Sequence, residues 1–139
     1  MLDASVAAKW FLPAASEPLS AEATGLLQRY AKGEANFLVS DLFFAELGNI
    51  LCKAERYGRS DRTVADAAIA KIVSSGFPSF PSKSLIESAG RIARDHARTV
   101  NDCLYVALAI QTRTQCITAD EKLARSLAGR LPVIWLGAL

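Results

Sequence analysis

Short apolar segments alternate along this chain with longer segments of helical periodicity, and this alternation limits the fold more than any other feature. The apolar segments that we expect to be strands lie at 2–6, 37–39, 115–118 and 133–136. Short apolar strands that alternate with helices are typical of a parallel sheet covered on both faces. The alternation therefore predicts an α/β fold, a three-layer α/β/α sandwich around a central parallel sheet of about five short strands.

The helical segments are bounded by residues that commonly end helices. Glycine follows three of them, at Gly33, Gly58 and Gly76, where a left-handed C-cap is common. The segment 77–81 holds two prolines, which lack a backbone N–H, so it allows at most a short edge strand. We expect helices at 7–11, 20–32, 42–57, 60–75, 85–96, 102–112 and 121–127.

Length and composition indicate one globular domain that spans residues 1–139. A chain of 139 residues, 51% hydrophobic and 22% charged, is large enough to bury a core without disulfides or a structural metal. Its cysteines, Cys52, Cys103 and Cys116, are widely spaced and fit neither a disulfide framework nor a zinc site. The sequence has no apolar run of about 18 residues and no signal-peptide pattern, so we expect a cytoplasmic protein without a membrane partner.

Three aspartates are expected at one edge of the sheet. Asp3 closes the first strand, and Asp120 follows the strand that ends at Thr118. Asp102 begins the helix that leads into that same strand. The carboxyl ends of parallel strands and the N-termini of the following helices share the edge at which α/β proteins usually bind ligands. We therefore expect the three carboxylates to lie close together although they are far apart in sequence.

Glu46 joins these aspartates by a separate argument, because it lies one turn inside its helix. Its neighbours at helical spacing, Leu42, Phe43 and Ile50, are core residues, so its side chain shares their face. A carboxylate there is costly unless a cation or a hydrogen-bond donor is near. Taken singly, each of the four acids can also be a turn residue, a helix cap or half of a salt bridge. It is their convergence that predicts a site.

A cluster of carboxylates without lysine or arginine beside it points to a particular chemistry. The carboxylates repel one another unless a divalent cation binds between them. Oxygen ligands alone favour Mg²⁺ or Mn²⁺ over zinc. Such an ion lowers the pKa of water and stabilises negative charge on a phosphodiester. The cluster therefore predicts a metal-dependent nuclease.

The charge of the rest of the chain suits a polyanionic substrate. The net charge is +2, and setting aside the four negative charges of the predicted site leaves +6 on the remainder. Basic side chains that can contact phosphates, unless they only form a solvated face, are Arg56, Arg59, Arg62, Arg91, Arg94, Arg98, Arg113, Lys122, Arg125 and Arg130.

Four segments, in this order, resemble the motifs of the PIN domains, and within that family the VapC-type ribonuclease toxins of type II toxin-antitoxin modules. No single motif is very specific, but the four motifs together, in this order and at the family's spacing, are specific. Cys103 stands where the family favours a small alanine, and this departure leaves the acids untouched. The matching segments are Leu2–Phe11, Ser40–Leu51, Asn101–Ala109 and Thr118–Leu123.

The resemblance implies an endoribonuclease that acts through a metal site. Asp3 and Asp102 are then direct ligands of Mg²⁺ or Mn²⁺, whereas Glu46 and Asp120 act through water. Ser5 and Thr118 line the pocket with their hydroxyl groups. The resemblance also implies an RNA substrate, a homodimer, and a cognate antitoxin protein that reaches the acidic pocket with a basic side chain. The acids implied as the metal site are Asp3, Glu46, Asp102 and Asp120.

Two other functions compete with this interpretation. Phosphatases and dehalogenases that form an aspartyl intermediate also carry an aspartate after the first strand. However, Asp3-Ala4-Ser5 lacks their Asp-x-Asp spacing, and the lysines stand outside the positions that this chemistry needs. The second alternative is a catalytically silent PIN-like module that binds RNA or protein. The presence of all four acids disfavours it, and metal-dependent cleavage separates the two functions.

Overall fold

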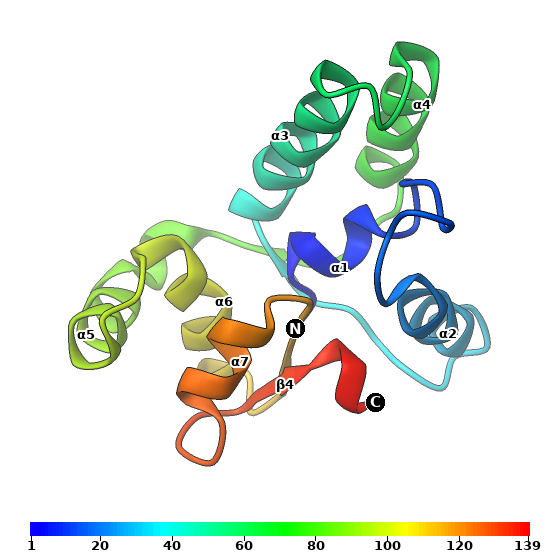
Figure 1. The fold of residues 1–139 in the computed structure, drawn as a ribbon. Helices are drawn as coiled ribbons and strands as arrows, with labels where there is room; N and C mark the ends of the chain where they lie inside the picture. Colours follow the sequence, from blue (N-terminus) through cyan, green and yellow to red (C-terminus); the bar gives the residue numbers. More distant parts are fainter.

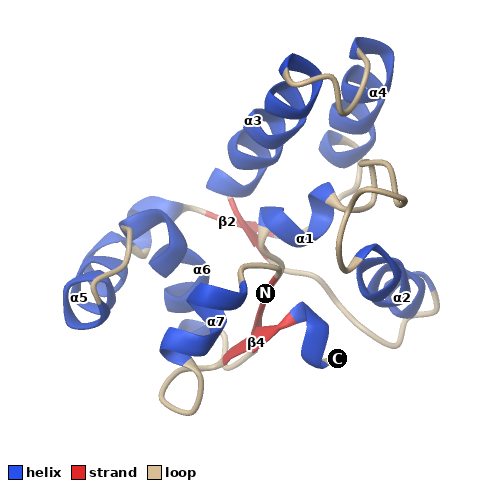
Figure 2. Cartoon of the chain, in the orientation of Figure 1, coloured by secondary structure: helices blue, strands red, loops and turns tan.

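Short parallel strands lie at the centre of the computed structural model, which describes residues 1–139 (Figure 2). Leu2 forms a parallel bridge with Ile117, and its N–H donates to the carbonyl of Leu38 at 2.9 Å, so the N-terminal segment joins two strand pairs. The order across the layer is therefore β2, β1, Leu2, β3, β4. The strands are β1 (Val39–Ser40), paired with β2 (Ser79–Phe80), and β3 (Cys116–Thr118), paired with β4 (Val133–Trp135).

Helices surround this layer, and the predicted α/β sandwich with a parallel sheet is confirmed. Figure 1 shows α5, α6 and α7 on one side of the strands and α2 on the other, with α3 and α4 forming a hairpin that projects from the layer. The helices are α1 (Ala4–Ala8), α2 (Ser20–Ala31), α3 (Leu42–Arg56), α4 (Arg62–Val73), α5 (Ile86–His96), α6 (Val100–Gln111) and α7 (Glu121–Leu127), with short 3₁₀ turns at Ser82–Ser84 and Leu136–Ala138.

The starts of two helices differ from the prediction. The first strand was predicted to extend to Val6, but α1 begins at Ala4 because the Asp3 carboxylate accepts the N–H of Ser5 at 3.0 Å and caps the helix. Helix α6 begins at Val100 rather than at Asp102, because the Thr99 hydroxyl accepts the Asp102 N–H at 3.1 Å. Asp102 therefore lies inside the first turn, and its carboxylate is not the cap.

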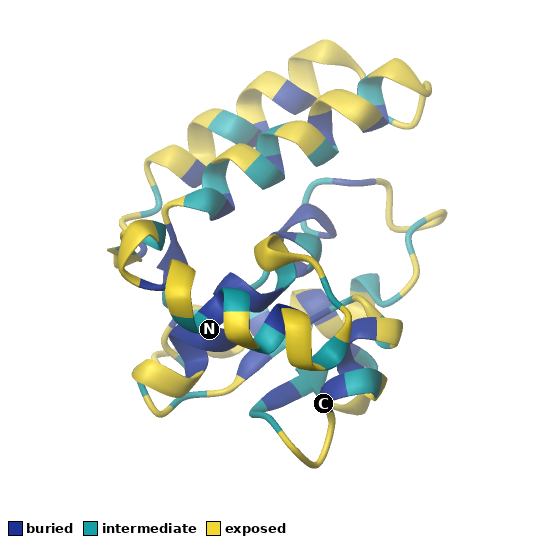
Figure 3. Cartoon of the chain, turned by 90° about the vertical axis from the view of Figure 1, so that its left-hand side faces the viewer, coloured by how far each residue is buried: buried dark blue, intermediate teal, exposed yellow.

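One continuous core holds the elements together and contains 35 buried hydrophobic residues. Figure 3 shows these buried residues gathered at the centre, while the outer faces of the helices are exposed. Helix α6 crosses this core, and each of its residues from Cys103 to Ala109 is buried, as its all-round apolar sequence predicts. No helix is both long enough and apolar enough to cross a membrane.

Candidate active site

The four predicted acids line one pocket, although they come from four separate segments. The pocket has a volume of about 360 Å³ and also includes Ser5, Asn49 and Asn101. It lies where the strand order reverses, because the chain leaves Leu2 toward β1 on one side of the layer and returns as β3 on the other. Such a switch point is the usual ligand site of an open parallel sheet. The acids in the pocket are Asp3, Glu46, Asp102 and Asp120.

The Asp3 side chain is held in the pocket by hydrogen bonds to both of its carboxylate oxygens. Oδ1 accepts the N–H of Ser5, and Oδ2 accepts the hydroxyl of Thr118. Burial raises the pKa of the Asp3 carboxyl, the two hydrogen-bond donors oppose that rise, and the negative charge of Asp102 adds to it. Asp3 is therefore fixed in place by donors but lacks a cation to balance its charge.

Thr118 and Ser5 form a hydroxyl network that joins the start of α1 to the end of β3. The Thr118 oxygen accepts the Asp120 N–H at 3.1 Å, and the Ser5 oxygen accepts the Ala119 N–H at 3.1 Å. Ser5 lines the pocket as predicted. Thr118 is fully buried and does not line it, so its hydroxyl acts on the site by contacting Asp3, Ser5 and the backbone of Asp120.

Glu46 reaches the pocket from α3 and is half-buried beside core residues. Burial raises the pKa of its carboxyl, the hydroxyl of Tyr105 opposes the rise, and the charges of Asp3 and Asp102 add to it. Tyr105 donates its hydroxyl hydrogen to Oε2 of Glu46, and burial also raises the pKa of this phenol. Sequence analysis did not single out Tyr105. The sequence does hold a signal for this contact, which is a tyrosine on a helix that is otherwise mostly apolar. A buried tyrosine hydroxyl usually needs a hydrogen-bond partner.

Asp102 in the first turn of α6 and Asp120 at the N-cap of α7 complete the pocket. The Asp102 carboxylate makes no hydrogen bond to the protein, since Thr99 caps α6 in its place. The Asp120 carboxylate accepts the Leu123 N–H at 2.9 Å and thereby caps α7. Asp120 therefore caps a helix as well as lining the pocket. The carboxylate of Asp102, in contrast, has no hydrogen-bond partner in the protein.

The donor set of the pocket fits a hard divalent cation. The ion pairs of the structure involve only Glu17, Glu55 and Glu121 among the acids, so no lysine or arginine neutralises the pocket. Carboxylate and hydroxyl oxygens are ligands that suit Mg²⁺ or Mn²⁺. However, no group of three acidic, histidine or cysteine side chains is arranged so that all three could bind the same metal ion.

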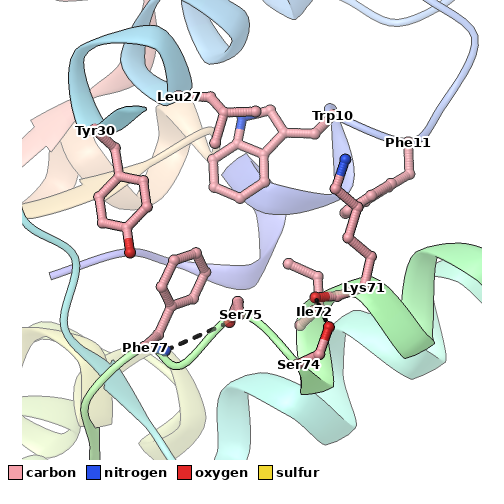
Figure 4. Close-up of a pocket in the computed structure, with 9 residues that line it drawn as sticks. All are labelled: Trp10, Phe11, Leu27, Tyr30, Lys71, Ile72, Ser74, Ser75 and Phe77. Carbon is pink, nitrogen blue, oxygen red and sulfur yellow. Dashed lines mark hydrogen bonds between the residues drawn. The ribbon is translucent and has the colours of Figure 1, made fainter. Parts of the chain in front are cut away.

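A second cavity of about 360 Å³, here called the aromatic pocket, lies between α1, α2 and α4 and was not predicted. It contains no acidic side chain, and its one charged residue is Lys71. Figure 4 shows the rings of Trp10, Tyr30 and Phe77 around it, coming from three separate segments. The aromatic pocket therefore lacks the carboxylates that would bind a hard divalent cation.

The fold and the acidic pocket define an α/β protein with a carboxylate site at the switch point of a parallel sheet. The family model of the PIN domain matches residues 1–126, and the chain belongs to the PIN-domain family. PIN domains are generally nucleases, often found in toxin-antitoxin modules, and they typically use divalent metals.

The solved structures that share this fold include PAE2754 from Pyrobaculum aerophilum, with a TM-score of 0.72 and 22% sequence identity, over 99% of this chain and 83% of that one. At this identity the likeness concerns the fold alone. No curated protein sequence matches the chain.

Proposed function

We propose that this protein is a Mg²⁺- or Mn²⁺-dependent endoribonuclease that hydrolyses RNA phosphodiesters in the acidic pocket. The observation that carries the proposal is the convergence of four carboxylates on one pocket without any lysine or arginine paired to them. A pocket of this composition repels a phosphodiester unless a cation lies between them. Its membership of a nuclease superfamily supports the same activity.

Each acid has a proposed task that follows from its contacts. Asp3 and Asp102 hold the cation directly, because Asp3 is fixed by two donors and the Asp102 carboxylate is free of protein partners. Asp120, which already caps α7, and Glu46 act through water. A bound divalent cation supplies charge stabilisation at the phosphodiester and a more acidic water. Glu46, whose carboxyl pKa is raised by burial, would suit the acceptance of a proton from the attacking water.

The proposed biological role is that of the toxin of a VapC-type toxin-antitoxin module. The motifs quoted above support it, as does the frequency of such modules among PIN domains. The proposed partners are RNA, a second copy of the chain and a cognate antitoxin. A basic side chain of the antitoxin fits an acidic pocket that has no cationic side chain of its own. The choice of RNA over DNA rests on the family resemblance alone.

The test is cleavage of end-labelled RNA and of a DNA of the same sequence by purified protein with Mg²⁺, Mn²⁺ or EDTA. We expect discrete RNA products with either metal and none with EDTA. An Asp3→Ala variant, checked for folding by circular dichroism, is expected to be inactive. The matched control is Asp95→Asn, because Asp95 is an exposed aspartate on α5 outside the pocket.

The outcomes separate the competing functions. Cleavage of DNA but not of RNA would keep the metal chemistry and replace the substrate. Metal-independent cleavage, or equal activity in Asp3→Ala, would reject the carboxylate site. RNA binding without cleavage of any RNA tested, by protein shown to be free of antitoxin, would favour the catalytically silent module.

A further inference from the structure

The Glu46 side chain has a single hydrogen-bond partner, and that partner is a buried tyrosine from another helix. The hydroxyl of Tyr105 on α6 donates to Oε2 of Glu46 on α3, across 59 positions in sequence. Tyr105 is only 2% exposed, and the residues on both sides of it along α6 are buried as well. The ring is therefore held rigidly by the core, and its hydroxyl is a fixed donor at the inner side of the pocket.

This hydrogen bond gives the two carboxylate oxygens of Glu46 different surroundings. Oε2 is taken by Tyr105, whereas Oε1 has no protein partner, and Glu46 lines the acidic pocket. Glutamate has three rotatable side-chain bonds, and an unpaired glutamate on a half-exposed surface samples many of their combinations. A single fixed donor restricts it to those that keep Oε2 within reach of the Tyr105 hydroxyl, while the side chain lines the pocket.

The need of a buried tyrosine hydroxyl for a hydrogen-bond partner does not explain why the partner of Tyr105 is a glutamate. A backbone carbonyl or a serine would satisfy the hydroxyl without bringing a further negative charge close to Asp3 and Asp102. Both of those charges act unfavourably on Glu46. An arrangement that is electrostatically costly for the metal-free protein makes sense when the carboxylate serves the ligand of the pocket.

We propose that Tyr105 is a positioning residue that holds the free oxygen of Glu46 toward the water through which Glu46 serves the divalent cation of the acidic pocket. The inference rests on the proposed function, because it assigns Tyr105 a part in that same site. Hydrogen-bond partners of metal-site side chains typically contribute 10- to 100-fold to metal affinity or activity. The effect of Tyr105 should fall in this range and should pass entirely through Glu46.

The first measurement is Mn²⁺ affinity by isothermal titration calorimetry on Tyr105→Phe, which removes only the hydroxyl. We expect Mn²⁺ binding about tenfold weaker than in the wild type, and kcat for RNA cleavage 10- to 100-fold lower with KM unchanged. The matched control is Tyr57→Phe, which removes the hydroxyl of an exposed tyrosine beyond the end of α3 and should change neither value.

A double-mutant cycle distinguishes positioning from a general structural effect. In a Glu46→Ala background, Tyr105→Phe should cause no further loss of Mn²⁺ affinity or kcat, because its target is already absent. An equal loss in both backgrounds would overturn the inference. So would a single Tyr105→Phe variant that binds Mn²⁺ and cleaves RNA like the wild type.

The same experiment distinguishes failure of this inference from failure of the proposed function. A wild-type protein that binds no Mn²⁺ would reject both. A wild-type protein that binds Mn²⁺ but cleaves no RNA would reject the ribonuclease activity, and the Mn²⁺ affinities would still decide the role of Tyr105.

An observation on the unmutated protein covers the case in which Tyr105→Phe does not fold. A tyrosine hydroxyl proton held by a buried carboxylate exchanges slowly and should give a separate downfield line in the proton NMR spectrum. Addition of Mg²⁺ should shift that line, and Glu46→Ala should abolish it. A line that is unaffected by saturating Mg²⁺ would contradict the proposed link between Tyr105 and the cation.

Discussion

The acidic pocket and the aromatic pocket have the same volume, about 360 Å³, but opposite energetic characters. In the aromatic pocket and the cluster behind it, Phe37 stacks on Tyr30 with ring centroids 4.6 Å apart and on Trp10 at 5.8 Å. Such pairs contribute about 0.5–1.5 kcal/mol each beyond the burial of their area. The acidic pocket instead gathers carboxylates that raise one another's pKa and lack a cation.

This difference teaches where to look for chemistry in a fold of this kind. A cavity lined by well-packed rings contributes to stability and offers no carboxylate to a metal ion. A cavity whose side chains cost stability in the metal-free protein retains them for the sake of a ligand. The two pockets should therefore respond in opposite ways to mutation, to metal and to pH.

The largest effect is expected from truncating the centre of the aromatic cluster. Phe37 is 4% exposed and contacts rings from the turn after α1, from α2 and from the loop before β2. Phe37→Ala should lower the free energy of unfolding by about 3–5 kcal/mol, as deletion of a buried aromatic ring does. Urea denaturation followed by circular dichroism measures this, and Mn²⁺ affinity of the folded fraction should be unchanged. A loss of Mn²⁺ affinity in a folded Phe37→Ala protein would show that the two pockets are energetically coupled and would contradict their separate roles.

The acidic pocket should give the opposite result when Asp3 is neutralised. Asp3→Asn keeps the shape of the side chain and should lower kcat for RNA cleavage by more than about 100-fold, above the range for an outer hydrogen-bond partner. The same change should raise the free energy of unfolding of the metal-free protein at neutral pH, because it removes a buried charge that no cation balances. Urea denaturation in EDTA gives the stability. A variant less stable than the wild type would show that the hydrogen bonds accepted by the Asp3 carboxylate outweigh the cost of its buried charge.

Divalent metal should stabilise the protein through the acidic pocket alone. At a Mg²⁺ concentration 100 times its dissociation constant, binding to the folded state adds about 2.7 kcal/mol to the free energy of unfolding. We expect this gain in the wild type and in Phe37→Ala, and not in Asp3→Asn. Denaturation curves with Mg²⁺ or EDTA measure it, with Ca²⁺ as a test of metal selectivity. An equal gain in Asp3→Asn would place the stabilising ion elsewhere.

Sequence reasoning reached the acids but only part of what holds them. The convergence of Asp3, Asp102 and Asp120 follows from strand and helix order, because parallel topology fixes which ends share an edge. The burial of Thr118 and the bond from Tyr105 to Glu46 depend on side-chain packing between elements, which no periodicity reveals. The aromatic pocket was missed for the same reason.

Helix boundaries show a second limit, which comes from competition between neighbouring caps. Both Thr99 and Asp102 are good N-cap residues, and the sequence alone favours neither. The structure uses Thr99, which frees the Asp102 carboxylate for the pocket. The early start of α1 has a related cause, since Asp3 both closes the first strand and caps the helix.

The smallest effect is a pH dependence of stability that should exist only without metal. Burial raises the pKa of Asp3 and of Glu46 in the folded state above their usual values of 3.8 and 4.5. The folded protein therefore holds these protons more tightly than the unfolded chain does. Their contribution to stability is fully present below the usual values and is lost as pH rises through the raised folded-state values.

Denaturation between pH 4 and pH 8 in EDTA should therefore show stability from these two groups falling as pH rises. The slope should be reduced in Asp3→Asn, which retains only Glu46, and unchanged in Phe37→Ala. Saturating Mg²⁺ should reverse the sign, because the cation binds the ionised carboxylates and competes with their protons. A metal-free slope that is identical in wild type and Asp3→Asn would mean that the Thr118 and Ser5 donors fully offset the burial of Asp3. The energetic contrast between the two pockets would then rest on Glu46 alone.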